Sequence, residues 1–301
     1  LQMLFAICQP SLSTESQIAL SLRILCGFGI DEIANAFLTN RETINKRLFR
    51  AKEKLRTENS AFEFPSNTEI EKRLETVLIT LYLLFSEGYY SESQEPVLRE
   101  DLCFEAMRLT ELLLENALTN QPAVNALYAL MCFHSSRFEA RKRSGGEMIL
   151  YPDQDETLWN KELITKGLYH LKKASRGKVI SKYHLEAGIA YWHTIKDDTN
   201  EKWENILQLF NQLLQMEYSP VAALNRTYAL SKARGKEVAI KEAEKLNLRG
   251  NYLYFTLLGE LYKDINPRKA KENLDRAYTL AKTANDKNTI LKKLYEIEEN
   301  S

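Results

Sequence analysis

Apolar residues recur at the spacing of an α-helix along this chain, most clearly after Ser66. The pattern Ser66-x-x-Glu69 is that of a capping box, and apolar residues then follow every three or four positions from Ile70 to Phe85. Glycine and proline, which interrupt helices, number only 11 and 7 among 301 residues, about half of their average share. These features predict an all-α globular protein and argue against a disordered chain or a β-sandwich.

Charge is unevenly distributed along a chain that is neutral in total. Lys plus Arg and Asp plus Glu both number 41, which excludes a generally basic nucleic-acid coat and an acidic solvating tail. Residues 41–56, however, hold 7 basic and 2 acidic residues, whereas residues 62–120 hold 12 acidic and 4 basic ones. We therefore expect a compact basic helix followed by an acidic helical region.

No segment has the features of a membrane span or a secretory signal. The longest apolar stretch, residues 77–85, is far shorter than the roughly 18 residues that a span needs. The four cysteines are scattered and form no CxxC pair, so we interpret them as reduced thiols of a cytoplasmic protein. The chain begins with Leu1 inside an apolar segment, which predicts that it is cut from a longer protein.

Three short helices are predicted at the N-terminus, in the order of a helix-turn-helix module. Their expected bounds and N-caps are 14–25 with Thr14, 30–37 with Gly29, and 39–56 with Thr39. In the third helix, Ile44, Leu48, Ala51 and Leu55 form one apolar stripe, which we expect to face inward.

The polar side of the third helix predicts a DNA-reading surface, because a helix presented in this way can enter a major groove. Lys and Arg near its start can donate to guanine, and Glu42 can accept from cytosine. Arg50, Lys52 and Lys54 lie further along and are expected to contact phosphates. The alternative is an ordinary surface helix with solvated charges. The predicted DNA-binding residues are Arg41, Glu42, Thr43, Lys46, Arg47, Arg50, Lys52 and Lys54.

Several segments, in the same order along the chain, are similar to those of one family of bacterial transcription factors. They are Ser21-Leu22-Arg23, Gly29 to Ala34, Thr43 to Ala51, Leu81 to Tyr89, Leu102 to Leu109, Ala126 to Arg141, and Gln154 to Trp159. The first three resemble region four of the sigma factors. The whole set resembles the extracytoplasmic-function sigma factors that carry a C-terminal tetratricopeptide-like extension.

This resemblance implies that the first module reads the minus-thirty-five promoter element and that the protein engages RNA polymerase core. Glu156 stands where the family usually has Arg, and Ser86 stands where it usually has Asn. Region two, which in this family grips the core enzyme and opens the minus-ten element, has no counterpart in these residues. We therefore expect this chain to recognise a promoter element but not to initiate transcription alone.

A repeat is predicted in the C-terminal third. Val221, Leu224 and Tyr228 recur 34 positions later as Phe255, Leu258 and Tyr262, the tetratricopeptide period. Gly259 is expected to let paired helices approach closely, a looser copy begins near Gly188, and residues 289–298 are expected to form a terminal helix. Such arrays present a groove for a peptide or a neighbouring domain. The alternative is that Tyr228, Tyr254 and Tyr262 are core packing, which we favour for Tyr228 and Tyr262. The groove candidates are Asn225, Arg226 and Tyr254.

No pattern of an enzyme or a metal site emerges. The four histidines show no paired ligand spacing, and the sequence has no nucleophile elbow, Walker loop or dinucleotide fingerprint. Asp197, Asp198 and Glu201 could hold a divalent cation, but a loop followed by an acidic helix start explains them better. Ser144-Gly145-Gly146 is interpreted as a turn. We expect no catalysis, no cofactor and no metal.

The sequence therefore predicts three parts: a helix-turn-helix domain at 1–59, a helical middle domain at 60–178 and a repeat domain at 179–301. The predicted function is promoter recognition by a sigma factor whose tail regulates or assists it. Two alternatives stay open, a peptide-binding repeat protein and a one-component regulator that does not bind core polymerase. A further hypothesis is that the acidic region folds back on residues 41–56 through Glu69, Glu71 and Glu75.

Overall fold

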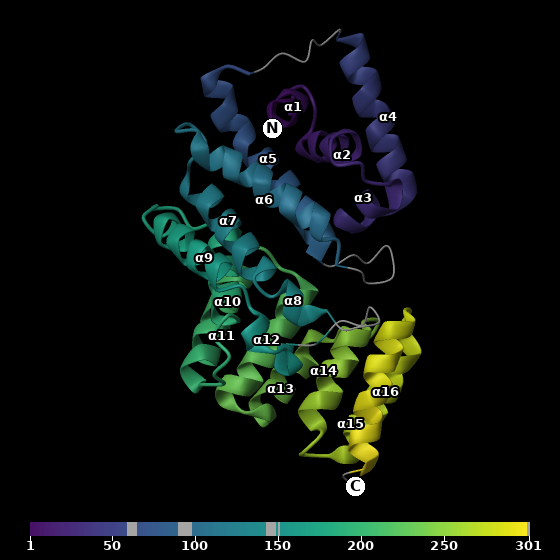
Figure 1. Cartoon of the computed structure of the whole chain (residues 1–301). Coiled ribbons are helices and arrows are strands. Elements are labelled where there is room, and N and C mark those ends of the chain that lie inside the picture. Colours follow the sequence, from purple (N-terminus) through teal and green to yellow (C-terminus); the bar gives the residue numbers. More distant parts are fainter. Residues whose placement is uncertain (59–64, 90–97, 143–148, 150, 300–301) are drawn as a thin grey trace. The chain divides into compact units, whose positions relative to one another are not determined.

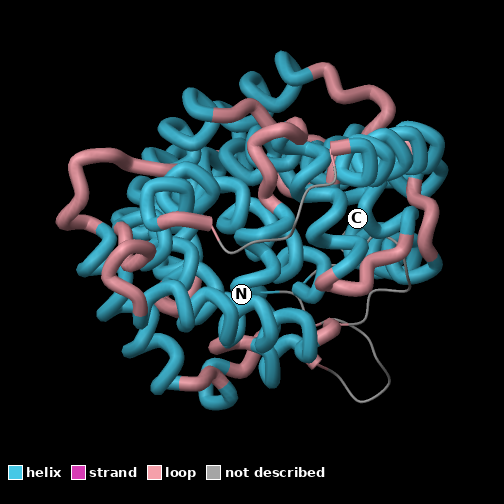
Figure 2. The backbone as a smooth tube through the Cα atoms, turned by 90° about the horizontal axis from the view of Figure 1, so that it is seen from above, coloured by secondary structure: helices cyan, strands magenta, loops and turns pink. Residues whose placement is uncertain are grey.

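The computed structural model describes residues 1–58, 65–89, 98–142, 149 and 151–299. Within these ranges the chain forms 16 α-helices and no β-strand, which confirms the all-α prediction (Figure 2). The chain divides into two compact units, Leu1–Ala187 and Gly188–Ser301, and the boundary falls inside helix α10 (Lys182–Trp192). The predicted division into three domains stays a prediction. Among the described residues, none of the helices combines the length and the apolar character that a membrane span requires.

The first unit contains ten helices, the last of which continues into the second unit. They are α1 (Gln2–Ile7), α2 (Thr14–Ile24), α3 (Ile30–Ala36), α4 (Arg41–Thr57), α5 (Asn67–Tyr89), α6 (Glu100–Glu115), α7 (Pro122–Ser135), α8 (Phe138–Arg141), α9 (Lys161–Ala174) and α10, with short 3-10 turns at Tyr151–Asp153 and Glu156–Leu158. The predicted helices of the N-terminal module exist within about two residues of these bounds. The turn predicted at Ser144-Gly145-Gly146 lies outside the described residues.

Two of the three predicted N-caps are wrong by one residue. The side chain of Ser13, not Thr14, accepts the hydrogen bond that starts α2, and Asn40, not Thr39, caps α4 by accepting from the Thr43 amide at 2.9 Å. A capping oxygen must reach the amide three positions on, and that position is held by the residue before Thr14 in α2 and by the residue after Thr39 in α4. Gly29 is the N-cap of α3, as predicted.

The core of the first unit is built on α5 and α7. Val77, Leu81 and Leu84 of α5 are fully buried, and nearly every residue of α7 is. Helix α9 lies close against α7 because Gly167 faces Phe133, where an added Cβ would stand 2.6 Å from the ring. Burying these apolar faces contributes most of the free energy that holds the helices together.

The helix-turn-helix module is anchored to α5 through α1, α2 and α3 (Figure 1). Arg73 of α5, itself buried, donates to the carbonyl oxygen of Phe5 at 2.9 Å, and Arg99 donates to Glu32 of α3 at 2.8 Å. Helix α4 packs on the other side of α2 and α3. Glu69 pairs with Arg73 on its own helix at 3.2 Å. The hypothesis that the acidic region folds back on residues 41–56 stays untested.

The second unit is a series of helices in which successive neighbours pack together. After the end of α10 they are α11 (Asn200–Met216), α12 (Pro220–Arg234), α13 (Lys236–Leu246), α14 (Tyr252–Tyr262), α15 (Pro267–Leu280) and α16 (Ala284–Glu299). Gly259 of α14 allows the close approach that the sequence predicted, because an added Cβ would lie 2.6 Å from Cγ of buried Leu274 on α15.

The predicted 34-residue register of the repeat is wrong at two of its three pairs. Val221 and Tyr228 are 50% and 39% exposed, whereas their supposed equivalents Phe255 and Tyr262 are buried. Helices α12 and α14 begin 32 positions apart, at Pro220 and Tyr252. The third pair, Leu224 and Leu258, keeps the predicted register, since both side chains are buried. Tyr228 is not the core residue that the sequence analysis favoured, although its ring contacts Trp203.

Candidate nucleic-acid interface

Helix α4 is presented by a tight turn after α3. The turn includes Leu38, which has a φ of +49° and is 90% exposed, and the Thr39 amide donates to the carbonyl oxygen of Ala34 at 2.9 Å. A positive φ is unusual for leucine and shows that the turn is held by its surroundings. Asn40 then caps α4, so that the first turn of this helix starts at the surface.

The apolar stripe of α4 faces inward, as predicted. Ile44, Leu48 and Ala51 are buried and Leu55 is half-buried. With this face fixed against α2 and α3, the geometry of the helix sets which side chains face solvent.

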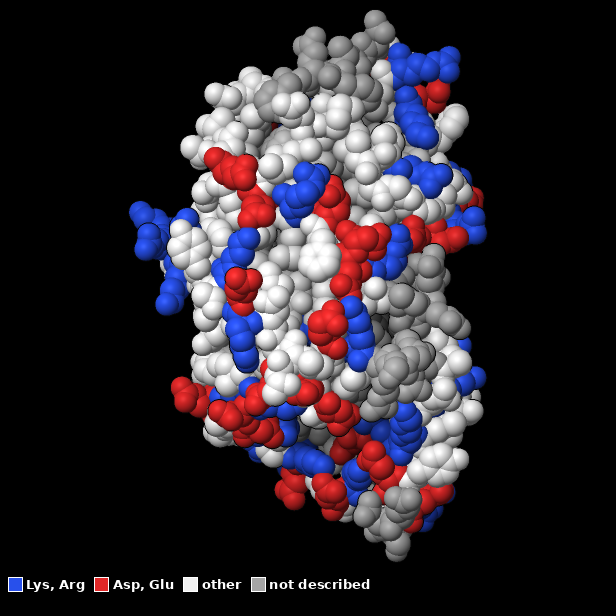
Figure 3. Space-filling model, in the orientation of Figure 1, with Lys and Arg blue, Asp and Glu red and all other residues white. Residues whose placement is uncertain are grey.

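The predicted DNA-binding residues lie on the solvent side of α4 or at its border. In the orientation of Figure 1, the space-filling view shows Lys and Arg side chains along this helix (Figure 3). Thr43 and Arg47 are half-buried, and the other six are exposed, namely Arg41, Glu42, Lys46, Arg50, Lys52 and Lys54. Their contact with DNA stays a prediction.

Three of the six predicted cations already have an ion-pair partner within the chain. Arg41 lies 3.1 Å from Asp31, and Lys46 lies 2.6 Å from Glu42. Lys54 donates to the carbonyl oxygen of Ser11 and lies 3.9 Å from the Glu58 carboxylate. Exposed ion pairs of this kind are worth only about 0–1 kcal/mol, so phosphates can replace these carboxylates at low cost.

The other three predicted cations of α4, namely Arg47, Arg50 and Lys52, form no ion pair with any described residue. Arg50 and Lys52 are exposed. The guanidinium of Arg47 lies 4.9 Å from the centre of the Phe37 ring, and its Nη1 is buried without a hydrogen-bond partner among the described residues. The stacking on Phe37 fixes the direction of this side chain.

Two exposed residues of the same face were missed by the sequence analysis. Asn45 is exposed, and Phe49 is 68% exposed, which is unusual for so large an apolar side chain. Both follow Glu42 at helical spacing, three and seven positions on, and that spacing was the available signal. An asparagine amide can pair with adenine, and an apolar ring can contact the thymine methyl group.

The groove candidates of the tail lie on two helices and have different surroundings. Asn225 of α12 is exposed, whereas Arg226 donates to Asn211 of α11 at 2.7 Å and lies 4.0 Å from Glu242 of α13. Arg226 thus bridges three helices. Tyr254 of α14 is buried but lines a pocket of the second unit.

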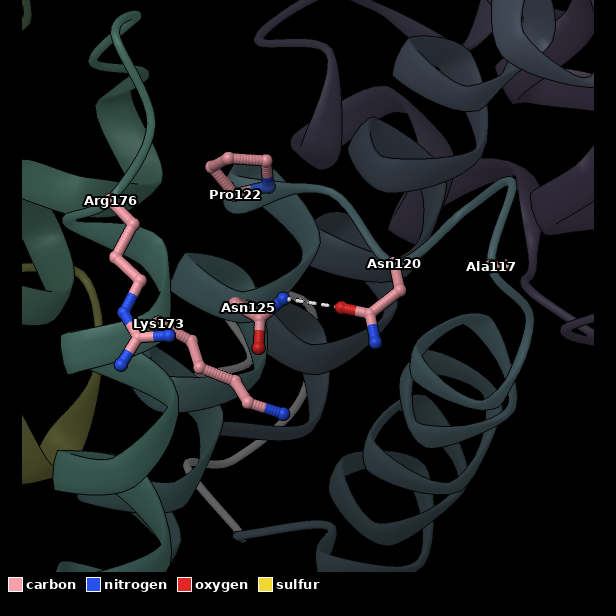
Figure 4. Close-up of a pocket in the computed structure, with 6 residues that line it drawn as sticks. All are labelled: Ala117, Asn120, Pro122, Asn125, Lys173 and Arg176. Carbon is pink, nitrogen blue, oxygen red and sulfur yellow. Dashed lines mark hydrogen bonds between the residues drawn. The ribbon is translucent and has the colours of Figure 1, made fainter.

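A shallow pocket of about 410 Å³ opens in the first unit between α7 and α9 (Figure 4). Asn125 donates to Asn120 at 2.8 Å, and its oxygen lies 2.8 Å from Nδ1 of His170. Lys173 and Arg176 border the pocket, and no signal in the sequence brought these residues together. Burial, assisted by the charges of Lys173 and Lys166, lowers the pKa of His170 to about 4.

Of the acidic residues considered as metal ligands, Asp198 is already engaged by neighbouring side chains. Asp198 lies 2.6 Å from Lys232 and accepts from the indole of Trp203. Thr199 then caps α11. Within the described ranges, no group of three or more His, Cys, Asp or Glu side chains is arranged to hold a metal ion.

Comparison with known proteins identifies the class of the N-terminal module. Residues 10–55, which include α2, α3 and most of α4, match the family model of sigma-70, region 4, as expected for a sigma-70 family factor with a DNA-binding helix-turn-helix. Residues 73–175 match a family of unknown function (DUF6596), so most of the middle helices form a recurring unit of their own.

An uncharacterized protein of Rhizobium meliloti (strain 1021) is 36% identical over 290 residues. The alignment covers 95% of this chain and 68% of the rhizobial protein. The chain therefore belongs to the same family as this protein. No solved structure matches this chain.

Proposed function

We propose that this chain is the promoter-recognising part of an extracytoplasmic-function sigma factor, with α4 reading the minus-thirty-five element. The observation that supports this most is the exposed polar face of α4 within a sigma-70 region 4 match. The module is anchored through α1, α2 and α3 to α5, and α4 packs on α2 and α3 with its polar side in solvent. A helix held in this way can enter a major groove.

The polar residues of α4 fall into two groups, one near the N-terminus of the helix and one further along it. Glu42 and Lys46, with Asn45 between them, lie in the first two turns, and we propose that they contact base edges. Arg50 and Lys52 lie further along, and we propose that they contact phosphates, which fix the position of the helix without reading sequence. Glu42 and Lys46 form an exposed ion pair at 2.6 Å on this face, which DNA can replace at low cost.

The other elements of the proposal follow from the family resemblance. The chain acts in the cytoplasm with core RNA polymerase as its partner, and it performs no chemistry of its own. Promoter opening requires a region two, which these residues do not supply. The C-terminal helices serve as a regulatory or interaction surface.

DNA binding can be tested by fluorescence anisotropy with a labelled duplex and the full chain over a range of salt concentrations. If about five phosphates are neutralised, the logarithm of affinity falls against the logarithm of salt concentration with a slope near −4.5. A slope near zero would contradict DNA binding. In-vitro transcription by the complete protein with core polymerase then separates a sigma factor from a one-component regulator, because only the sigma factor supports initiation.

A further inference from the structure

The second unit contains a pocket of about 340 Å³ formed by α13, α14, α15 and the loop that joins α13 to α14. Its floor is aromatic: Tyr254, Phe255 and Tyr262 of α14 are all buried. Polar side chains surround this floor, and they are Glu244, Asn247, Arg249, Lys269, Glu272, Asn273 and Arg276. The pocket thus combines an apolar base with a charged rim.

Three cations of the rim have no carboxylate partner among the described residues. Lys269 lies 4.9 Å from the centre of the Tyr262 ring, and Arg276 lies 4.7 Å from the centre of the Phe255 ring. Arg249 donates to Asn247 in its own loop at 2.7 Å. The aromatic rings orient the first two cations without neutralising them.

Neighbouring cations on α15 that do not line the pocket are paired. Arg268 lies 3.1 Å from Glu272, and Lys271 lies 2.6 Å from Glu298. The absence of carboxylate partners is therefore confined, on this helix, to the two cations that line the pocket. Such a local excess of positive charge favours an anionic ligand.

The two carboxylates of the rim are already engaged. Glu244 accepts a hydrogen bond from the hydroxyl of Tyr262 at 2.7 Å, and Glu272 is paired with Arg268. Because these two carboxylates are engaged elsewhere, the three cations stay available to a ligand. The carboxylates are still negatively charged, however, and would repel a continuous phosphate backbone. A ligand whose negative charges are spaced and separated by apolar groups fits this distribution better than a nucleic acid does.

We propose that this pocket binds an acidic peptide segment of a partner protein. A carboxylate of the peptide accepts charge-assisted hydrogen bonds from Lys269, Arg276 and Arg249, and an adjacent apolar side chain packs on the aromatic floor. This inference deepens the proposed role of the tail as an interaction surface. It does not depend on DNA recognition by α4.

The test uses the full chain and two fluorescein-labelled probe peptides. One alternates Glu with Leu and has a free C-terminal carboxylate, and the other has Gln in place of Glu and an amidated C-terminus. We expect the acidic probe to bind at least about tenfold more tightly, since a hydrogen bond to a charged group is worth about 1.5–3 kcal/mol. Equal affinity of the two probes would overturn the proposal.

Variants locate the binding within the chain. Arg276→Gln and Arg249→Gln should each weaken binding of the acidic probe about five- to tenfold. Lys271→Gln removes the same charge from α15 outside the pocket and should leave affinity unchanged. Arg249 lies in a loop, so its variant tests the pocket even if Arg276→Gln perturbs folding. Unchanged affinity in Arg249→Gln would contradict the assignment.

Other occupants give different results. Tighter binding of a labelled single-stranded oligonucleotide that is lost in Arg276→Gln and Arg249→Gln would identify a nucleic-acid site, and a concentration-dependent dimer lost in the same variants would identify a second copy of the chain. Either outcome overturns the peptide proposal. Duplex DNA binding measured on the same samples should be unchanged, so a failure of this proposal is distinguishable from a failure of DNA recognition.

Discussion

Two cations of α4 that differ in their surroundings should respond differently when they are neutralised. Arg50 is exposed and unpaired among the described residues, whereas Lys54 already holds the Ser11 carbonyl oxygen and lies near Glu58. Each phosphate that a free cation neutralises contributes about 0.9 to the salt slope of DNA binding. A cation that leaves a carboxylate to meet a phosphate contributes less, because the carboxylate takes up counterions in exchange.

We therefore expect Arg50→Gln to reduce the magnitude of the slope by about 0.9 and Lys54→Gln to reduce it by less than half of that. Between about 50 and 200 mM salt, a difference of 0.9 corresponds to a change of roughly 3.5-fold in the affinity ratio of wild type to variant. The loss of affinity in Arg50→Gln should accordingly be larger at the lower salt concentration by this factor.

The assay is anisotropy of a labelled duplex, titrated with each variant at several salt concentrations. Arg56→Gln serves as the matched control, because Arg56 lies at the C-terminal end of the same helix and pairs with Glu53 at 3.6 Å. Identical slopes for wild type and Arg50→Gln would refute the assignment of Arg50 to a phosphate. Equal effects of Arg50→Gln and Lys54→Gln would refute the argument from intramolecular pairing.

Three further predictions concern the fold. The pKa of His170 is lower in the folded chain than its ordinary value, so stability present above about pH 6.5 is lost as the pH falls toward 4. Urea unfolding at pH 7 and pH 5 should show that His170→Gln removes about 2 kcal/mol of this pH dependence of stability. An unchanged pH dependence would exclude His170 as its source. Gly259→Ala should destabilise the folded chain by up to about 2 kcal/mol in thermal unfolding, because overpacking against Leu274 costs about 1–3 kcal/mol and alanine recovers about 1 kcal/mol of helix propensity. A more stable variant would show that α14 and α15 can separate. Arg99→Gln should lower the stability of the chain by about 1–2 kcal/mol, because it leaves the part-buried Glu32 without its cation. The same variant should raise the rate of hydrogen exchange in α3. An unchanged exchange rate would show that this contact does not anchor the module.

The helices themselves were predictable because their signals are local. Apolar spacing placed Ile44, Leu48 and Ala51 on the inner face of α4, and the structure agrees. The N-caps were harder, since Thr39 and Asn40 are both good capping residues and only the backbone geometry decides between them. The family of the N-terminal module could be inferred from sequence for the same reason, because its motif is contiguous.

The tail was less predictable because its register depends on packing. Tyr228 and Tyr262 look equivalent in sequence, but only Tyr262 is buried. The pocket next to Tyr262 was not foreseen either. It joins Arg249, from a loop, to Lys269 and Arg276 on a later helix, and only the fold brings these positions together.

The central claim is that the solvent-facing start of α4 reads DNA sequence. The most direct measurement is selection of duplexes from a random library by the full chain, repeated with Lys46→Ala and Glu42→Ala. Selected duplexes should share a short motif, and each variant should relax the preference at particular positions, a loss of about 1–3 kcal/mol of discrimination per base contact. Selection without a shared motif, or a motif that both variants retain unchanged, would contradict the claim.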